Sequence, residues 1–256
     1  MTAPTPRSLS FDTAAAQYAA ARPGYPPALL DAVEELAGRP LRGARAVDVG
    51  AGTGIATRLL HERGARVTAV EPGPGMAAEL HRSLPSVPMV RGDGNRLPLA
   101  TGSVDLLTYA QSWHWTDPDL SVPEARRVLR PGGALALWWN VSDLSTPWVA
   151  GQDDRLREYL GADARVHGRP GDATSRNLSL LSDDAFAKRL LPWSRRVPVD
   201  THLANLATHS AFLVLGAAGE EPTRRFLDEE RGHLATVFPD GVVEERYVVE
   251  LAVLTA

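Results

Sequence analysis

The chain has 256 residues and a formal net charge of −4 at pH 7, a length that suits one α/β domain with a sizeable core. The acidic balance argues against an enzyme that acts on nucleic acid, because such enzymes usually carry a basic face. The absence of cysteine excludes thiolate nucleophiles, zinc–thiolate sites and disulfides.

The sequence gives no sign of export or of membrane insertion. Residues 1–7 are not followed by a hydrophobic stretch, so no secretion signal is predicted. The longest apolar run, at residues 211–218, is far shorter than the ~20 residues that cross a bilayer. We therefore expect a cytoplasmic protein without a membrane partner.

Residues 11–26 predict an alanine-rich helix that ends at Pro23-Gly24. Tyr18 and Arg22 stand four residues apart on it and therefore share one face. One interpretation is a lid over the site, in which Arg22 pairs with a carboxylate of a cofactor or a substrate. The other is an anchoring helix whose arginine caps a surface acid. We prefer the lid. Another helix is expected at 26–37, with Gly38 at its end.

The next element is an apolar strand at 45–49 that runs into Gly50, Gly52 and Gly54. Glycines at such a turn supply positive φ and let a ligand approach the backbone, and the following helix, expected at 55–63, offers free N–H groups. Glu71 ends the next apolar run, 21 residues after Gly50. A nucleotide-binding βαβ unit places its ribose-binding acid at that point.

The spacing of the glycines indicates which nucleotide is bound. A dinucleotide fingerprint, G-x-G-x-x-G, needs glycine at the position of Ile55. The tighter pattern G-x-G-x-G favours S-adenosylmethionine (SAM), which brings no pyrophosphate to the helix N-terminus. An ordinary tight turn would explain the loop alone, but the elements that follow argue against it.

Strands and helices continue to alternate. Strands are expected within 87–94, where a short apolar run ends at Asp93-Gly94, and at 104–110 and 134–139, the last preceded by a helix that ends in the segment 127–133. This alternation predicts an α/β fold, a Rossmann-like, doubly wound and mostly parallel sheet. Ligands of such sheets lie outside the carboxyl ends of the strands, so Gly50, Glu71 and Asp93 should converge there.

The loop at 111–117, after the strand at 104–110, holds His114 between two tryptophans. We expect both Trp113 and Trp115 to line the site, because a loop at this edge would otherwise expose them to water. An aromatic face attracts a sulfonium cation by about 0.5–2 kcal/mol. His114 either accepts a proton from the methylated atom or orients the substrate by a hydrogen bond, and alignment alone supplies much of the acceleration.

Residues 142–190 are the least regular and predict an insertion beside the site. Strands at 195–200 and 245–253, with an amphipathic helix at 223–237 between them, complete a seven-stranded sheet. We expect one domain over 1–256: N-terminal helices and lid at 1–40, the SAM-binding core at 41–141, the insertion at 142–190, and closing strands and helices at 191–256.

Other chemistries have no support in the sequence. The seven histidines show no metal-ligand spacing, so no metal is expected. Neither a G-x-S-x-G elbow nor a phosphate-binding P-loop is present.

Several segments resemble, in the same order, the bacterial small-molecule class I SAM-dependent methyltransferases similar to trans-aconitate methyltransferase. They are 11–26, 47–54, Glu71-Pro72, 91–93, 111–117, 129–133 and Trp139-Asn140. The resemblance covers most of positions 11–148 and is specific for SAM use but not for the substrate. It implies that the three glycines cradle the methionyl part and the ribose, that Glu71 holds the ribose hydroxyls, and that Asp93 and Gly94 meet the adenine. Gln111 and the His114 loop would face the sulfonium and the acceptor.

The expected site residues fall into three sets. The cofactor-binding set is Tyr18, Arg22, Gly50, Gly52, Gly54, Glu71, Pro72, Met76, Asp93, Gly94 and Gln111. The acceptor-binding set is Trp113, Trp115, Trp139 and Asn140, and His114 is the expected catalytic residue.

The predicted function is transfer of a methyl group from SAM to an oxygen or nitrogen, or to a carbon, of a small molecule by in-line displacement, with S-adenosylhomocysteine as product. The aromatic loop favours a planar acceptor. Two alternatives remain: a protein that binds SAM without transferring its methyl group, as a cyclase or a sensor, and an NAD-dependent dehydrogenase, which Ile55 disfavours. The identity of the acceptor and the oligomeric state have no signal in the sequence.

Overall fold

The computed structural model describes residues 15–160, 186–209, 212 and 219–256. Its internal contacts group the chain into two compact units. Among the described residues, unit 1 comprises 15–23, 141–160, 192–209, 212 and 219–248, and unit 2 comprises 24–140, 186–191 and 249–256. The expected single domain with its four segments stays a prediction.

Unit 2 contains the part of the chain in which helices and strands alternate. Its elements are α2 (Ala28–Leu36), β1 (Arg45–Val49), α3 (Ile55–Glu62), β2 (Arg66–Glu71), α4 (Pro74–Ser83), β3 (Met89–Arg91), β4 (Val104–Ala110), the 3-10 turn η3 (Trp113–Trp115), α5 (Pro118–Val128) and most of β5 (Leu129–Ser142). All residues of β4 except the last are buried, as expected for a central strand covered on both faces.

Unit 1 is mainly helical in its described part. Its helices are α1 (Ala15–Ala21), α6 (Pro147–Leu160), α8 (Val199–Ala207) and α10 (Glu220–Val237), accompanied by parts of β6 (Ala187–Pro198) and β7 (Val242–Thr255). Two apolar clusters hold these elements together: Leu156, Leu206, Phe212 and Phe226 form one, and Leu203, Leu234 and Val243 form the other.

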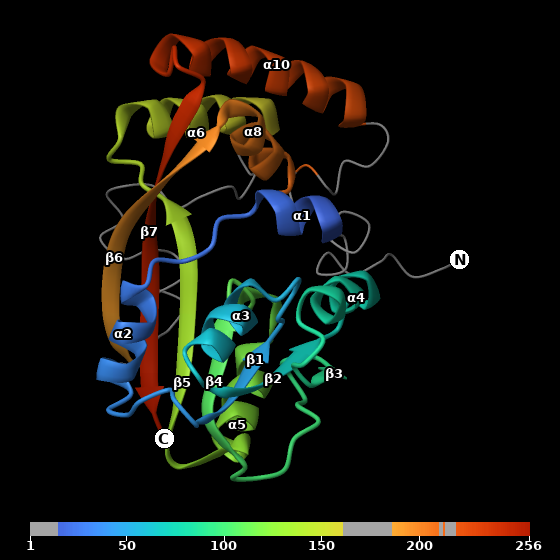
Figure 1. Ribbon diagram of the computed structural model, residues 1–256, viewed down its shortest axis with the longest axis vertical. Helices are drawn as coiled ribbons and strands as arrows, with labels where there is room; N and C mark the ends of the chain where they lie inside the picture. The colour runs from blue at the N-terminus through green and yellow to red at the C-terminus, as the bar shows by residue number, and fades with distance from the viewer. Residues whose placement is uncertain (1–14, 161–185, 210–211, 213–218) are drawn as a thin grey trace. The chain divides into compact units, whose positions relative to one another are not determined.

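The strands form one seven-stranded sheet in the order β3-β2-β1-β4-β5-β7-β6 (Figure 1). The pairs β1–β2, β1–β4, β2–β3 and β4–β5 are parallel. The end of β7 meets the start of β5 with reciprocal bonds, from Gly132 N–H to Ala256 O (2.9 Å) and from Ala256 N–H to Gly133 O (2.8 Å), and the β7 arrow points opposite to β5 in Figure 1. The predicted α/β class and the mostly parallel, seven-stranded sheet are confirmed.

The register of the parallel strands brings their carboxyl ends to one edge. Val49, the last residue of β1, pairs with Val70, and Glu71, the last residue of β2, pairs with Arg91. Ala110 at the end of β4 pairs with Trp138 in β5. The residues that follow these positions therefore begin at the same edge of the sheet.

The structure corrects several element boundaries. The segment 142–190 is not irregular at its start, because α6 occupies Pro147–Leu160, and β6 begins at Ala187; residues 161–185 lie outside the described residues. The strand expected at 195–200 ends at Pro198, where α8 follows. The helix expected to end in the segment 127–133 stops at Val128, because Leu129 already pairs with Val104.

Two further differences concern helices. The alanine-rich helix is described from Ala15, so positions 11–14 lie outside the described residues. Helix α4 has no counterpart among the expected elements, although Pro74 is suited to a first helical turn and the buried Met76, Ala77 and Leu80 have helical spacing.

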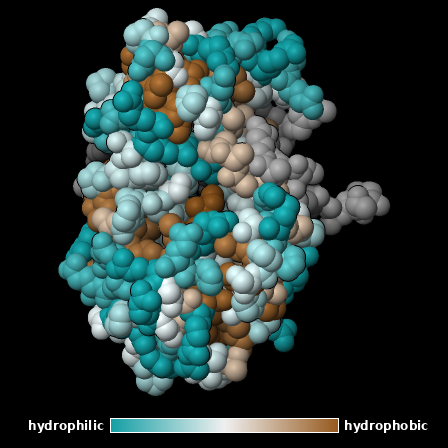
Figure 2. Space-filling view, in the orientation of Figure 1, coloured by the Kyte–Doolittle hydropathy of each residue, from teal (hydrophilic) through white to brown (hydrophobic). Residues whose placement is uncertain are grey.

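Hydrophilic side chains cover most of the face seen in Figure 2, and apolar residues appear in separate groups between them. None of the helices in the described part of the chain combines the length and the apolar character that crossing a bilayer requires.

A buried carboxylate lies within the central strand β1. Asp48 is fully buried and accepts hydrogen bonds from Thr57 Oγ1 (2.6 Å) and Thr108 Oγ1 (2.9 Å), which tie α3 and β4 to β1. Burial raises the pKa of Asp48 to about 6, although the two hydroxyl bonds partly oppose the increase. The folded protein therefore keeps a proton on Asp48 at a pH where the unfolded chain has lost it.

We expect Asp48 to make the protein less stable as the pH rises from 4 to 6, because the folded state binds the extra proton in this range. Relative to the wild type, Asp48→Asn should gain up to about 3 kcal/mol of unfolding free energy between pH 4 and pH 7, as measured by urea denaturation. The exposed Asp228 on α10 supplies the control, Asp228→Asn. Parallel pH profiles for the wild type and Asp48→Asn would contradict the assignment.

Candidate functional site

The turn after β1 is shaped by close packing at Gly50. This residue has φ +65°, and a Cβ atom on it would lie 2.6 Å from Ser112 Cβ. Ser112 is itself fixed, because its Oγ donates to Val49 O at 2.6 Å. Only glycine therefore fits at position 50 without moving the start of the loop after β4.

Gly52 differs from Gly50 in what surrounds it. Its φ is +57°, but apart from Gly52 itself and its two chain neighbours no atom of the described residues lies within 4 Å of the position that a Cβ would take. Its N–H donates to Glu71 Oε2 (2.8 Å), and Gly73 N–H donates to Glu71 Oε1 (2.7 Å). The buried Glu71 carboxylate thus joins the glycine loop to the start of α4, while the space beside Gly52 stays open. Gly54, with φ +91°, is the N-cap of α3.

The other expected cofactor residues of unit 2 occupy the ends of β2, β3 and β4. Asp93 is exposed, and its Oδ1 accepts from Asn95 N–H at 2.8 Å. Gly94 is buried, and its carbonyl accepts from Tyr109 Oη at 3.2 Å. The carbonyl of Pro72 accepts from the Arg91 guanidinium, and Met76 is buried on α4.

Gln111 has an unusual backbone. Its φ is +60°, which makes it the one non-glycine residue with positive φ in the described part of the chain. This conformation costs about 1–2 kcal/mol outside glycine. Gln111 N–H donates to Trp138 O (2.9 Å), and Gln111 Nε2 donates to Asn140 O (3.3 Å). These bonds hold the strained residue between β4 and β5, and such strain is concentrated at functional sites.

The two tryptophans beside His114 have different environments. Trp113 is 3% exposed and packs edge-on against Tyr109, with ring centroids 4.8 Å apart. Trp115 is 37% exposed, and its ring lies 4.7 Å from the exposed His114 ring. Trp113 thus packs in the core, where Tyr109 offers it an apolar surface, and only Trp115 presents an exposed ring; the acceptor-binding role of both tryptophans stays a prediction.

Trp139 is buried as well, and it contacts His114 directly. Its indole Nε1–H donates to His114 Nδ1 at 3.2 Å. Because Nδ1 accepts this bond, the neutral ring carries its hydrogen on Nε2. His114 is thereby a hydrogen-bond donor at Nε2. Asn140, the next residue, donates from Nδ2 to Gly24 O at 3.5 Å.

Tyr18 lies on α1 in unit 1, and Arg22 follows the last residue of that helix. The Arg22 guanidinium carbon lies 4.8 Å from the centre of the Tyr18 ring, a cation–π arrangement, and Arg22 Nη2 donates to Thr208 O at 3.2 Å. The two side chains contact each other as expected, although α1 ends at Ala21 and does not include Arg22. Their role toward a cofactor stays a prediction, as does the lid.

Comparison with known proteins gives the family. A family model described as a methyltransferase domain matches residues 47–137, the stretch from β1 into β5. A solved structure described as a provisional type II methyltransferase from Anaeromyxobacter dehalogenans superposes with a TM-score of 0.67 at 28% identity, and the match covers 92% of this chain and 97% of that one. Residues 47–137 therefore match a methyltransferase domain, and the chain has the fold of a solved methyltransferase over most of its length.

Curated relatives agree with this assignment. An uncharacterized methyltransferase of Mycobacterium bovis is 44% identical over 156 residues, 61% of this chain and 60% of that protein. A demethylmenaquinone methyltransferase of Beutenbergia cavernae is 39% identical over 116 residues, 45% of this chain and 46% of that protein. The chain thus spans about half to three fifths of the length of these relatives.

The methyltransferase domain has groups that fit SAM. The open space beside Gly52 lets a ligand approach the backbone, and each carboxylate oxygen of Glu71 has two lone pairs with which to accept hydrogen bonds, as a ribose diol requires. Glu71 stands at the carboxyl edge of the sheet, where ligands of open α/β sheets bind. These groups can bind a nucleoside ligand that carries no pyrophosphate, such as SAM.

Two residues that shape the site were not recognised in the sequence. Ser112 packs against Gly50 from 62 positions away in the chain, and no local pattern signals such a contact. Asp48 had a signal, since a lone acid within the apolar strand at 45–49 must find buried donors. It finds them in Thr57 and Thr108.

The contrast between Gly52 and Gly38 tests the glycine loop. Gly38, after α2, has φ +62° and likewise no described atom within 4 Å of where a Cβ would lie, so alanine at either position should cost about 1–2 kcal/mol of backbone strain. We expect Gly52→Ala to weaken SAM binding at least about tenfold in calorimetry, because the methyl group fills the open space. Gly38→Ala should bind SAM normally. Equal affinities in the two variants would exclude Gly52 from the cofactor site.

Proposed function

We propose that this protein transfers the methyl group of SAM to an oxygen or nitrogen, or to a carbon, of a small-molecule acceptor. The observation that carries the proposal is the open backbone at Gly52, held in place by the buried Glu71 carboxylate at the carboxyl edge of the sheet. This is a site for a ligand with hydroxyl donors that comes close to the main chain.

The bound cofactor supplies a methyl group already activated by a sulfonium. The residues of the chain bind the cofactor and the acceptor and align the acceptor atom with the methyl group. In the proposed arrangement Gly50, Gly52 and Gly54 shape the loop for the methionyl part and the ribose, Glu71 accepts from the ribose hydroxyls, and Asp93 with Gly94 meets the adenine. Pro72 and Met76 border this region, and Gln111 faces the sulfonium. Alignment of this kind is worth on the order of 7–11 kcal/mol.

The acceptor is proposed to be planar and partly apolar. Trp115 offers an indole face that is 37% exposed, beside the exposed His114. A flat ring stacked on Trp115 would be bound largely through apolar contact, and a hydroxyl or carbonyl oxygen on that ring would accept from His114 Nε2. The relative named demethylmenaquinone methyltransferase acts, by its name, on a quinone precursor, which is consistent with this chemistry.

The proposed transfer is tested with SAM labelled in its methyl group and a panel of phenols, hydroquinones, amines and carboxylic acids. We expect label in a planar hydroxylated or amino acceptor and stoichiometric S-adenosylhomocysteine, both detected by mass spectrometry. Tight SAM binding without label in any acceptor would favour a protein that binds SAM without transfer. Binding of NAD in place of SAM would favour a dehydrogenase.

We expect His114 to orient the acceptor as a hydrogen-bond donor, because the Trp139 indole fixes its neutral ring with the hydrogen on Nε2. His114→Gln keeps a donor close to this position and should retain most of the turnover, whereas His114→Ala should lose about tenfold, the value of one hydrogen bond. The exposed His61 on α3 supplies the control, His61→Gln. Losses of about 10²–10⁴ in both His114 variants would instead identify a general base.

A further inference from the structure

Two loops of unit 2 that are assigned to different ligands contact each other. The cofactor loop, 93–95, contains Asp93 and Gly94, the residues proposed for the adenine. The acceptor loop, 113–117, belongs to the proposed acceptor site. A Cβ atom on Gly94 would lie 2.8 Å from Thr116 Cγ2, so only glycine lets the two loops approach this closely.

Asn95 connects the two loops by hydrogen bonds. Its Oδ1 accepts from Asp117 N–H at 2.8 Å, and its own N–H donates to Asp93 Oδ1 at 2.8 Å. The two bonds use different groups of one residue, so the position of the Asp93 carboxylate influences the position of the oxygen that Asp117 bonds. A ligand bound to Asp93 can therefore act on the acceptor loop through Asn95.

Asp117 is the point at which the acceptor loop becomes helix α5, and it is the N-cap of that helix. Two main-chain bonds of 3.0 Å, from the N–H groups of Trp115 and Thr116, close the 3-10 turn before it. Turns of this type have poor hydrogen-bond geometry. A further bond at the end of the turn therefore helps to hold the His114 ring where the acceptor is proposed to bind.

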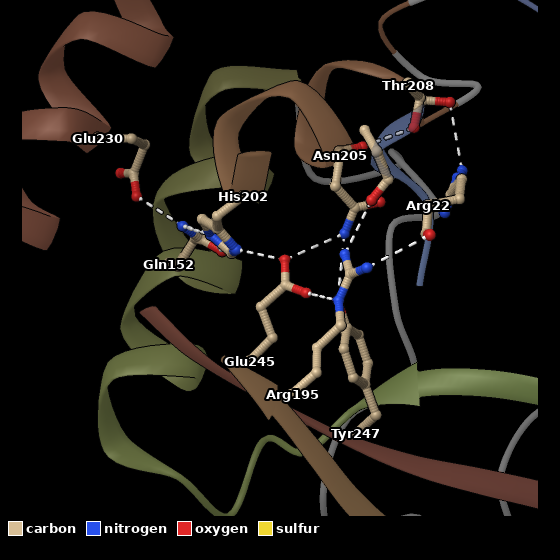
Figure 3. Close-up of polar contacts among 10 residues, drawn as sticks. Arg22, Gln152, Arg195, His202, Asn205, Thr208, Glu230, Glu245 and Tyr247 are labelled. Atoms are coloured by element: carbon tan, nitrogen blue, oxygen red, sulfur yellow. Dashed lines mark hydrogen bonds and ion pairs between the residues drawn. The ribbon is translucent and has the colours of Figure 1, made fainter. Parts of the chain in front are cut away.

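The buried asparagine of unit 1 has a different environment. Asn205 is 4% exposed and donates to Tyr247 Oη at 3.1 Å and to Glu245 Oε1 at 3.3 Å (Figure 3). These partners are buried side chains of the same unit, and Arg195 pairs with Glu245 from β6. Such an asparagine stabilises the interior. Asn95 is half-buried and bonds two loops that carry proposed ligand-binding residues, which favours a role in binding.

We propose that Asn95 is a positioning residue that makes the order of the acceptor loop depend on the bound cofactor. This inference rests on the proposed function, in which the adenine meets Asp93. The amino group of adenine is a donor, so the cofactor fixes the Asp93 carboxylate and, through it, the N–H of Asn95. Asn95 Oδ1 then stays on Asp117 N–H. The turn that presents His114 is ordered before the acceptor arrives, and the acceptor does not have to provide that free energy.

The decisive variant is Asn95→Ala, which removes the acceptor of Asp117 N–H. It should fold, because the packing at Gly94 is unaffected. Asn95→Asp is the conservative variant, since its carboxylate keeps an oxygen that can accept from the same N–H. Ser103→Ala is the matched control: it removes another bond between a side chain and the main chain, from Ser103 Oγ to Ala100 O at 2.7 Å, at the amino end of β4.

The probe is S-adenosylhomocysteine, which has the adenine of SAM. Its Kd is measured by calorimetry, and hydrogen exchange of the Trp115 and Thr116 amides is measured with and without it. These amides have their acceptors in the turn itself, so no substitution removes their bonds directly. In the wild type, Asn95→Asp and Ser103→Ala, we expect saturating S-adenosylhomocysteine to slow this exchange at least about fivefold. In Asn95→Ala, the Kd should stay within about twofold of the wild type, and the slowing should fall below about twofold.

Equal slowing in Asn95→Ala and the wild type would overturn the proposal, as would a loss of slowing that Asn95→Asp does not restore. If the wild type binds S-adenosylhomocysteine without slower exchange in the turn, the proposal fails and the proposed cofactor site stands. If Asn95→Ala does not bind the probe, Asn95 supports the cofactor loop itself, and the proposed dependence is wrong. A wild type that does not bind S-adenosylhomocysteine would contradict the proposed function.

Discussion

The candidate site depends on one buried carboxylate. Glu71 accepts the N–H of Gly52 with one oxygen and the N–H of Gly73 with the other. A buried carboxylate is costly unless it is hydrogen-bonded, and main-chain amides of a tight turn are costly to bury without acceptors. The Glu71 carboxylate and the two main-chain amides satisfy each other's requirement for a hydrogen-bond partner. These bonds fix the loop after β1 relative to the start of α4. In this arrangement the space beside Gly52 is open.

Local sequence patterns were sufficient to predict the bounds of two strands that are mostly apolar runs. The strands at 45–49 and 104–110 were predicted at their observed bounds, because a short, mostly apolar run bounded by turn residues is the pattern of a strand that is covered on both faces. Helix α6 was missed for a physical reason: its buried residues include Gln152 and Asp153, so the face that it buries is not apolar. Those polar groups are buried because His202, Glu230 and Arg157 pair with them, and all of these partners except Arg157 are distant in sequence.

The same limit applies to the site. The sequence placed Gly52, Glu71 and His114 at the carboxyl edge of the sheet through alternation and spacing alone, and the strand register agrees with that placement. It did not reveal that Trp113 is a core residue or that Trp139 fixes the ring of His114. The sequence does not distinguish a tryptophan whose ring packs on Tyr109 from one that donates to a histidine nitrogen or one that binds a ligand. Only the packing of β4 against β5 decides between these.

The unequal surroundings of Gly50 and Gly52 give a means of sorting related sequences. At position 50 the neighbouring Ser112 enforces glycine for packing reasons in this chain. At position 52 the protein itself imposes only the backbone angle, and asparagine or aspartate adopts that angle at modest cost. Under the proposed function, a homologue that retains the first glycine and has lost the second keeps the architecture but binds the cofactor more weakly.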